Sequence, residues 1–182
     1  MTPATNNRQP TTAILAELKA RLTALKLADN VTPAFSRVEL FDCESLLEAF
    51  TLLTIADKRI CVIVPTDETF ERRPGDQIMV ITRLLPVTLL ISDRKLGNRT
   101  AALFGDGTDL GAYGLLELAL PVVTGRLLEN PNGVTSAPAH ASVLIVKNEK
   151  EKQNLPGRAA VALELHCRGG SLQAQLGPGP IL

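Results

Sequence analysis

The sequence has few aromatic side chains and no excess of charge of either sign. Aromatic residues make up 3% of the 182 residues, with no tryptophan and one tyrosine. Proteins that hold single-stranded nucleic acid stack its bases on aromatic rings, so this composition argues against that function. The 19 basic and 19 acidic residues cancel to a formal net charge of zero, whereas nucleic-acid-binding domains are usually basic. We therefore predict no specific recognition of nucleic acid.

The chain also lacks clustered cysteines and long apolar runs. Cys43, Cys61 and Cys167 are far apart, and no CxxC or Cys/His cluster occurs, which argues against a zinc site. No run reaches the roughly 18 apolar residues of a membrane-spanning helix. Residues 1–10 are too polar for a signal peptide. These absences predict no metal site and no membrane contact, and they place the protein in a reducing cytoplasm.

Apolar residues make up 45% of the sequence, which is enough for one hydrophobic core. Residues 59–65, Arg-Ile-Cys-Val-Ile-Val-Pro, predict a central strand buried on both faces, although periodicity leaves a buried helix open for so short a run. Pro86 interrupts the apolar residues 76–92, which predicts two strands or one strand broken by a bulge, with residues 87–92 near the centre of the sheet. Further strands are predicted at residues 35–41 (a short edge strand), 142–147 and 158–167.

Three helices are predicted from apolar residues at helical spacing. Thr11 or Thr12 is predicted to cap the first, which runs to about residue 27, and Asp42 is predicted to cap the second, which fades near residue 57. The third begins near Gly111 and runs towards Leu128, with Pro121 either kinking or restarting it. These elements predict an α+β fold with a mixed, mainly antiparallel sheet flanked by two or three helices in a single domain. The predicted organisation is a flexible N-terminal arm (residues 1–10), the domain (residues 11–170) and a Pro/Gly-rich C-terminal tail (residues 171–182).

The motifs that suggest ligand binding are incomplete. Residues 105–111, Gly-Asp-Gly-Thr-Asp-Leu-Gly, lack the sixth-place glycine of a dinucleotide fingerprint and the Gly-Lys-Ser/Thr ending of a P-loop. Asp106 and Asp109 lack the closing glutamate of a calcium loop, so we interpret the segment as a helix-capping turn. His140 and His166 have no local signature of nucleophilic catalysis, although contact with a distant cysteine is left open. We predict no catalytic residue, no cofactor and no metal ligand.

Two polar segments are candidates for contacts between subunits. Residues 66–75 are charged and residues 129–141 are rich in proline, and both are predicted to be exposed loops. Complementary charge in such loops sets register and partner choice more than affinity. The candidate interface residues are Phe70, Glu71, Arg72, Arg73, Asn130, Asn132 and His140.

Three stretches, preceded by an amphipathic helix, resemble a known protein family. They are Ser-Arg-Val-Glu-Leu-Phe-Asp at residues 36–42, Leu-Leu-Ile-Ser-Asp-Arg-Lys-Leu-Gly at 89–97 and Gly-Ala-Tyr-Gly-Leu-Leu-Glu-Leu-Ala at 111–119. In this order they resemble the tail terminators of Mu-like long-tailed bacteriophages, over roughly residues 13–167. The shared stretches are short, and none is catalytic.

The resemblance implies a structural virion protein with no enzymatic activity and no cofactor. Six copies would form a ring that caps the tail tube, stops its growth and connects it to the neck. The tail tube protein and a neck or head–tail connector protein would be its partners, with the sheath protein as a further candidate. The protein would belong to the tail or neck of the virion and assemble in the cytoplasm of the bacterial host. The alternatives are a head–tail connector and a small nucleotide-binding or enzymatic domain that uses residues 105–111.

Overall fold

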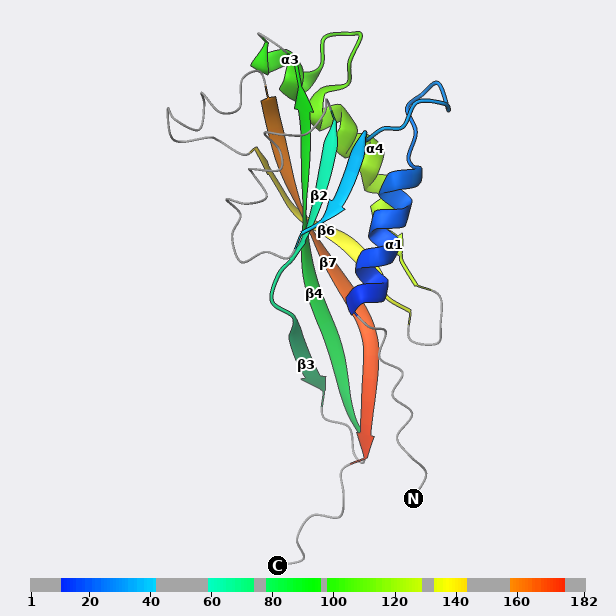
Figure 1. Ribbon diagram of the computed structural model, residues 1–182. Helices are drawn as coiled ribbons and strands as arrows, with labels where there is room; N and C mark the ends of the chain where they lie inside the picture. Colours follow the sequence, from blue (N-terminus) through cyan, green and yellow to red (C-terminus); the bar gives the residue numbers. More distant parts are fainter. Residues whose placement is uncertain are drawn as a thin grey trace, which may run out of the picture.

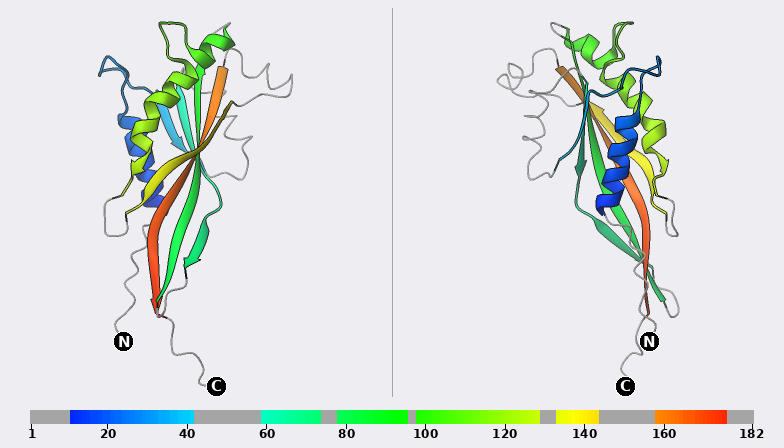
Figure 2. Two further views of the ribbon diagram at one scale, coloured as in Figure 1. Left: turned by 180° about the vertical axis from the view of Figure 1, so that it is seen from behind. Right: turned by 45° about the vertical axis from the view of Figure 1, so that its right-hand side comes forward.

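The computed structural model describes residues 11–41, 59–73, 78–95, 98–128, 133–143 and 158–175, with only the backbone described for residues 72–73, 78–81 and 170–175. The helices are α1 (Thr11–Ala24), α3 (Arg99–Phe104) and α4 (Gly111–Val123). The strands are β1 (Arg37–Leu40), β2 (Ile60–Pro65), β3 (Thr69–Arg73), β4 (Ile78–Arg94), β5 (Gly125–Arg126), β6 (Thr135–Val143) and β7 (Arg158–Gln175). In Figures 1 and 2, α1 and α4 lie on one face of a single sheet, and α3 lies at the end of the sheet where β4 ends and β7 begins.

The strands form one sheet in the order β1-β2-β4-β7-β6-β5, and β3 also pairs with β4. Because β7 occupies one side of β4, both β2 and β3 lie on its other side. The pair β1–β2 is parallel, and the other pairs are antiparallel. The prediction of a single α+β domain with a mixed, mainly antiparallel sheet and two or three helices is therefore confirmed.

The centre of the sheet is the pair β4–β7, which was predicted only in part. β2 is buried as expected, with Ile63 0% exposed and Val64 2% exposed, but it stands second from the edge of the sheet. The prediction that it is the central strand is wrong, because burial on both faces reports what covers a strand and not its place in the order. The prediction that residues 87–92 lie near the centre is confirmed, since they belong to β4.

Two hydrophobic clusters lie on opposite faces of the sheet, since successive side chains of a strand point to opposite sides. The larger cluster joins α1 and α4 to the sheet, with Ile14, Leu18, Leu22, Leu115, Ala119, Cys61, Ile63, Leu85, Val87, Leu89, Ile91, Val161, Leu163, Leu165 and Cys167 among its members. The smaller cluster, on the other face, contains Ile60, Val62, Val64, Leu90 and Ala160. The alternation predicted for residues 158–167 is confirmed on the helix-covered face of β7.

β4 runs unbroken through Pro86, so the break or bulge predicted there is absent. The carbonyl of Pro86 accepts hydrogen bonds from the N–H of Thr66 at 3.0 Å and from its hydroxyl at 3.1 Å. The backbone of Pro86 therefore faces the connection between β2 and β3. Its missing N–H falls where β2 has ended and β3 has not begun, so no ladder bond is lost. The irregularity of β4 lies instead between Ile81 and Arg83.

Two segments that were predicted to be loops contain strands. Residues 69–73 of the charged segment form β3, and residues 135–141 of the proline-rich segment belong to β6. β7 also continues to Gln175, into the predicted C-terminal tail. These strands escaped sequence analysis because an edge strand needs few apolar side chains, and its charges and prolines look like those of a loop.

The observed helices agree with the predicted ones better than the strands do. α1 spans Thr11–Ala24, so Thr11 and Thr12 belong to the helix, and it ends three residues before the predicted residue 27. The chain then turns, and the N–H of Leu27 donates to the carbonyl of Thr32 at 2.9 Å. α4 begins at Gly111 as predicted and includes Pro121, but it ends at Val123. The helix predicted after Asp42 lies outside the described residues.

The segment 98–111 contains the short helix α3. The side chain of Asn98 caps this helix by accepting a hydrogen bond from the N–H of Ala101 at 2.9 Å.

Candidate functional site: the β-arm and its edges

Half of the β4–β7 pair extends well beyond the helices (Figures 1 and 2). We call this part the β-arm; it consists of β3, residues 78–82 of β4 and residues 169–175 of β7. Its registers run from Thr69↔Leu84 to Arg73↔Val80 between β3 and β4, and from Ile78↔Gln175 to Ile81↔Leu172 between β4 and β7. The β-arm is thus a three-stranded ribbon with β4 in the middle and β3 and β7 outside.

A buried ion pair lies where the β-arm leaves the core. Arg83 is 1% exposed; its guanidinium pairs with the carboxylate of Glu68 and donates to the hydroxyl of Thr11. That hydroxyl donates in turn to Glu68 at 3.4 Å. Because α1 begins at Thr11, the carboxylate also lies near the positive end of the helix dipole, which stabilises it. The three residues join α1, β4 and the start of β3. Sequence analysis missed them, although one arginine inside the apolar run 78–92 was a usable signal.

The outer edges of the core are protected against further strand pairing. β1 is short and charged, with Arg37 Nε 2.7 Å from a carboxylate oxygen of Glu39. β6 carries Pro138 and a register shift between Pro138 and His140. Short strands, charges, prolines and bulges are the features by which proteins prevent edge-to-edge association. The core edges are therefore poor sites for strand addition.

The edges of the β-arm differ from those of the core. In the described part of the chain, no strand pairs with the outer edge of β3, and β6 stops pairing with β7 at Arg168. β3 carries Glu71, Arg72 and Arg73 in its sequence, whereas residues 169–175, Gly-Gly-Ser-Leu-Gln-Ala-Gln, contain neither charge nor proline. The β7 edge of the arm thus lacks the charges and prolines of the core edges, and its one described irregularity is the register shift opposite Ile81 and Arg83.

The predicted interface residues fall on separate surfaces. Phe70 and Glu71 lie on β3 together with Arg72 and Arg73, and Phe70 is 46% exposed. His140 lies on β6, across the sheet from β3. The remaining two, Asn130 and Asn132, lie outside the described residues.

Each of these two surfaces has a polar side-chain contact on the face of the sheet opposite the helices. Glu71 reaches across β4 to Arg168, with a carboxylate oxygen 3.8 Å from a guanidinium nitrogen. His140 is opposite Glu164 in the β6–β7 ladder, and Nε2 of His166 lies 2.9 Å from a carboxylate oxygen of Glu164. Both pairs are substantially exposed, so they contribute little to stability.

The described cysteines are not placed for nucleophilic catalysis. Burial raises the pKa of the Cys61 thiol far above its ordinary value, and it raises the pKa of Cys167 to about 11. Both thiols belong to the cluster under the helices, whereas His166 follows the alternation of β7 onto the other face. The Cys/His contact left open by the sequence therefore does not form with these two cysteines. Cys43 lies outside the described residues.

The segment 105–111 is a tight turn that Lys95 holds closed. One carboxylate oxygen of Asp106 accepts the N–H groups of Thr108 and Asp109, both at 3.1 Å. The ammonium group of Lys95 pairs with Asp106 and lies 3.4 Å from Asp109. This cation offsets one of the two carboxylate charges. Leu110, the N-cap residue of α4, makes no side-chain capping hydrogen bond, so the segment does not cap α4 through a side chain, whereas the N–H of Gly105 donates to the carbonyl of Ala101 at the end of α3.

An apolar patch flanks this turn at the end of the molecule away from the β-arm. The rings of Phe104 and Tyr113 stack with centroids 5.6 Å apart, and Phe104 is 64% exposed. Leu110 is 45% exposed. We call these three residues the corner patch. Exposed aromatic side chains of this kind are common in protein–protein contacts.

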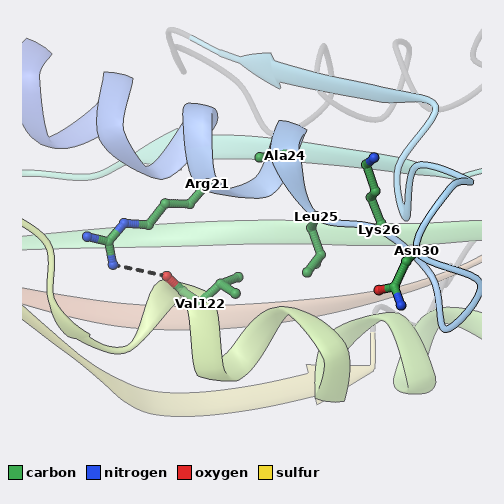
Figure 3. A pocket seen from close by; sticks show the side chains of 6 residues that line it. All are labelled: Arg21, Ala24, Leu25, Lys26, Asn30 and Val122. Carbon is green, nitrogen blue, oxygen red and sulfur yellow. Dashed lines mark hydrogen bonds between the residues drawn. The ribbon is translucent and has the colours of Figure 1, made fainter.

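A shallow groove of about 550 Å³ separates the C-terminal end of α1 from α4 (Figure 3). Arg21, on its wall, donates to the carbonyl of Val122 at 3.2 Å and to those of Arg126 and Leu127 at 2.9 and 3.1 Å. Its Nε also donates to Glu17 at 2.7 Å. The guanidinium group therefore stabilises the C-terminal end of α4, where a cation is favourable, rather than presenting its charge to a ligand.

Among the residues that the structure describes, no three His, Cys, Asp or Glu side chains are grouped to hold a metal ion. None of the described helices is long and apolar enough to cross a membrane. Neither a protein-family model nor a curated protein sequence matches this chain.

Proposed function

We propose that this protein is a structural virion protein, a ring-forming tail terminator that caps the tail tube of a long-tailed bacteriophage and connects it to the neck. The sequence stretches at residues 36–42, 89–97 and 111–119 suggest the family. The observation that carries the proposal is the β-arm, a ribbon that projects from the core with an outer strand on each side.

A ring needs two different contact surfaces on each subunit. A cyclic assembly uses head-to-tail contacts, in which one patch of a subunit meets a different patch of the next. The two outer strands of the β-arm lie on opposite sides of β4 and differ in charge, so they are different patches. Zero net charge removes the long-range repulsion that keeps many proteins monomeric.

A terminator must also contact the tube on one side of its ring and the neck on the other. The corner patch and the β-arm lie at opposite ends of the molecule, as Figure 1 shows for α3 and β3. The corner patch is therefore our candidate for one of these two contacts. We expect Phe104→Ser and Leu110→Ser to leave the ring intact and to weaken its binding to tube or neck protein.

Mass spectrometry of the intact assembly and negative-stain microscopy test the proposal directly. We expect a closed ring, with a hexamer as the predicted stoichiometry, that sediments with tail tubes and binds at their ends. A protein that stays monomeric at every concentration, and that neither binds tubes nor occurs in virions, would contradict the proposal. Binding to the portal side of the neck without binding to tubes would favour a head–tail connector instead.

A further inference from the structure

The β-arm has two outer edges, and a head-to-tail ring brings one edge of each copy beside the other edge of the next. We propose that β3 of one copy pairs with residues 169–175 of β7 in the neighbouring copy, so that the β-arms form one continuous sheet around the ring. This inference rests on the proposed function, because it needs a ring of identical subunits.

Strand direction agrees with this pairing. β3 and β7 are both antiparallel to β4, so they run in the same direction. In a ring whose axis runs along the β-arms, each copy keeps the strand direction of its neighbour. β3 and β7 of adjacent copies then form a parallel pair, and the backbone groups of both outer edges acquire partners, as in other cases of strand addition.

Charge and ring closure together distinguish this pairing from the two symmetric ones. Pairing β3 with β3 would bring Arg72 and Arg73 of two copies together. Pairing β7 with β7 around a two-fold axis would give a closed dimer and leave β3 at the edge. The β3–β7 pairing places a charged strand beside a neutral one, so no like charges face each other.

An ion pair also becomes available across the boundary. Within one copy, Glu71 reaches Arg168 only across the intervening strand β4, at 3.8 Å. In the register that sets Arg73 of one copy beside Gln173 of the next, Glu71 and Arg168 become a diagonal pair on neighbouring strands, where long side chains meet. Such complementary charge fixes register and orientation.

Engineered disulfides test the pairing because their geometry separates contacts within a copy from contacts between copies. Arg73 and Gln173 are both opposite Val80, on its two sides. Within one copy they are two strand spacings apart, about 9.6 Å, which exceeds the roughly 7 Å limit between Cα atoms for a disulfide. Across the proposed boundary they lie on adjacent strands, about 4.8 Å apart.

The experiment uses the full chain with Cys43→Ser and the double substitution Arg73→Cys/Gln173→Cys. A second double variant, Arg73→Cys/Gln175→Cys, covers a stagger of one pleat. After mild oxidation we expect a ladder of covalent multimers on non-reducing gels, from dimer up to the whole ring, for at least one of the two. The matched controls carry only one of the two introduced cysteines, and we expect them to form no multimers. Melting profiles like that of the wild type show that the variants fold.

Three results would overturn the inference. A ring seen by mass spectrometry without a ladder from either double variant would refute the edge pairing and leave the proposed function standing. Dimers from Gln173→Cys alone would indicate two-fold pairing of β7 with β7. If the wild type and both double variants stay monomeric at every concentration and do not bind tail tubes, the inference and the proposed function are both contradicted.

Discussion

The β4–β7 pair has two parts, the β-arm and the part inside the core, which we call the core half. Their faces and edges are covered in different ways. In the core half, α1 and α4 cover one face, further strands flank the pair on both sides, and side chains such as Leu89 and Leu165 are almost completely buried. In the β-arm, the same two strands continue with β3 as their one described neighbour, beyond the reach of the helices (Figure 1). An isolated two-stranded ribbon is marginally stable in water, and a third strand adds independent stability only when the ribbon has a hydrophobic face or packs against a helix. This difference is expected if the core half specifies the subunit and, as we propose, assembly completes the β-arm.

The largest difference between the halves is expected from an aspartate placed in each. Ile63→Asp places an unpaired charge at a position that is 0% exposed, and the cost reaches the roughly 5–15 kcal/mol that stabilises a whole domain. Phe70→Asp in the β-arm changes a side chain that is 46% exposed, and we expect a loss within about 1 kcal/mol.

Circular dichroism and urea unfolding measure both changes. Ile63→Val is the control for simple loss of volume, at about 1 kcal/mol. A soluble Ile63→Asp protein with a native melting profile would contradict the assignment of β2 to the core.

The buried ion pair of Arg83 and Glu68 lies where the β-arm leaves the core, a place we call the root of the β-arm. Although it carries charge, we expect substitutions there to destabilise the protein as core substitutions do. Arg83→Met leaves Glu68 without its guanidinium partner and should lower the free energy of unfolding by about 3–5 kcal/mol. Arg168→Met, on an arginine that is 55% exposed, is the matched control and should change it by less than about 0.5 kcal/mol. Equal effects of the two substitutions in urea titrations would place the root outside the core. Replacing Arg83 and Glu68 together by methionine should recover part of the loss.

The boundary between the halves depends on one glycine. Gly169, where β6 stops pairing with β7, has φ +152°, and a Cβ there would lie 2.6 Å from the carbonyl oxygen of Gly133 and 2.7 Å from Cα of Val134. Gly169→Ala should therefore cost about 3 kcal/mol, from backbone strain and overpacking together. Gly125, with φ +86° and no atom within 4 Å of its Cβ position, is the matched control, and Gly125→Ala should cost about 1–2 kcal/mol from strain alone. A Gly169→Ala protein as stable as Gly125→Ala in thermal unfolding would mean that β7 passes Gly133 less closely than the structure shows.

The smallest effect concerns pH and the loop that follows α1 in the core half. Hydrogen bonds from the Thr32 hydroxyl and from the N–H groups of Val31 and Thr32 hold the pKa of Asp29 below its ordinary value. A carboxyl whose pKa is lower in the folded state stabilises the protein above its ordinary pKa, and this contribution is lost as the pH falls through the folded pKa. The melting temperature of the wild type should therefore fall more steeply than that of Asp29→Asn as the pH drops below about 4. Parallel curves for the two proteins would show that the turn does not depend on the charge.

Sequence reasoning predicted the core half better than the β-arm, for a physical reason. Burial leaves periodic apolar patterns, and these located α1, the start of α4, the burial of β2 and the alternation of residues 158–167. The outer strands of the β-arm leave no such pattern. β3 is polar and β7 continues into glycine, so these residues looked like a loop and a tail. β6, at the edge of the core, contains proline and also looked like a loop.

The sequence predicted four exposed residues that lie in the candidate site, but not the strand that carries them. Phe70, Glu71, Arg72 and Arg73 were proposed as interface residues of a loop, and they lie on an outer strand of the β-arm. The importance of Arg83, Glu68 and Gly169 depends on contacts between distant segments, such as the approach of β7 to Gly133, and no local pattern reports these.

Hydrogen exchange of backbone amides, followed in dilute protein and in assembled rings, tests most directly the claim that assembly completes the β-arm. We expect that amides of residues 169–175 and of β3 exchange quickly in the dilute subunit and become protected by at least about tenfold in the ring. Amides of β2 and of the core half of β4 should stay protected in both. Equal protection of the β-arm in the isolated subunit and in the ring would contradict the account.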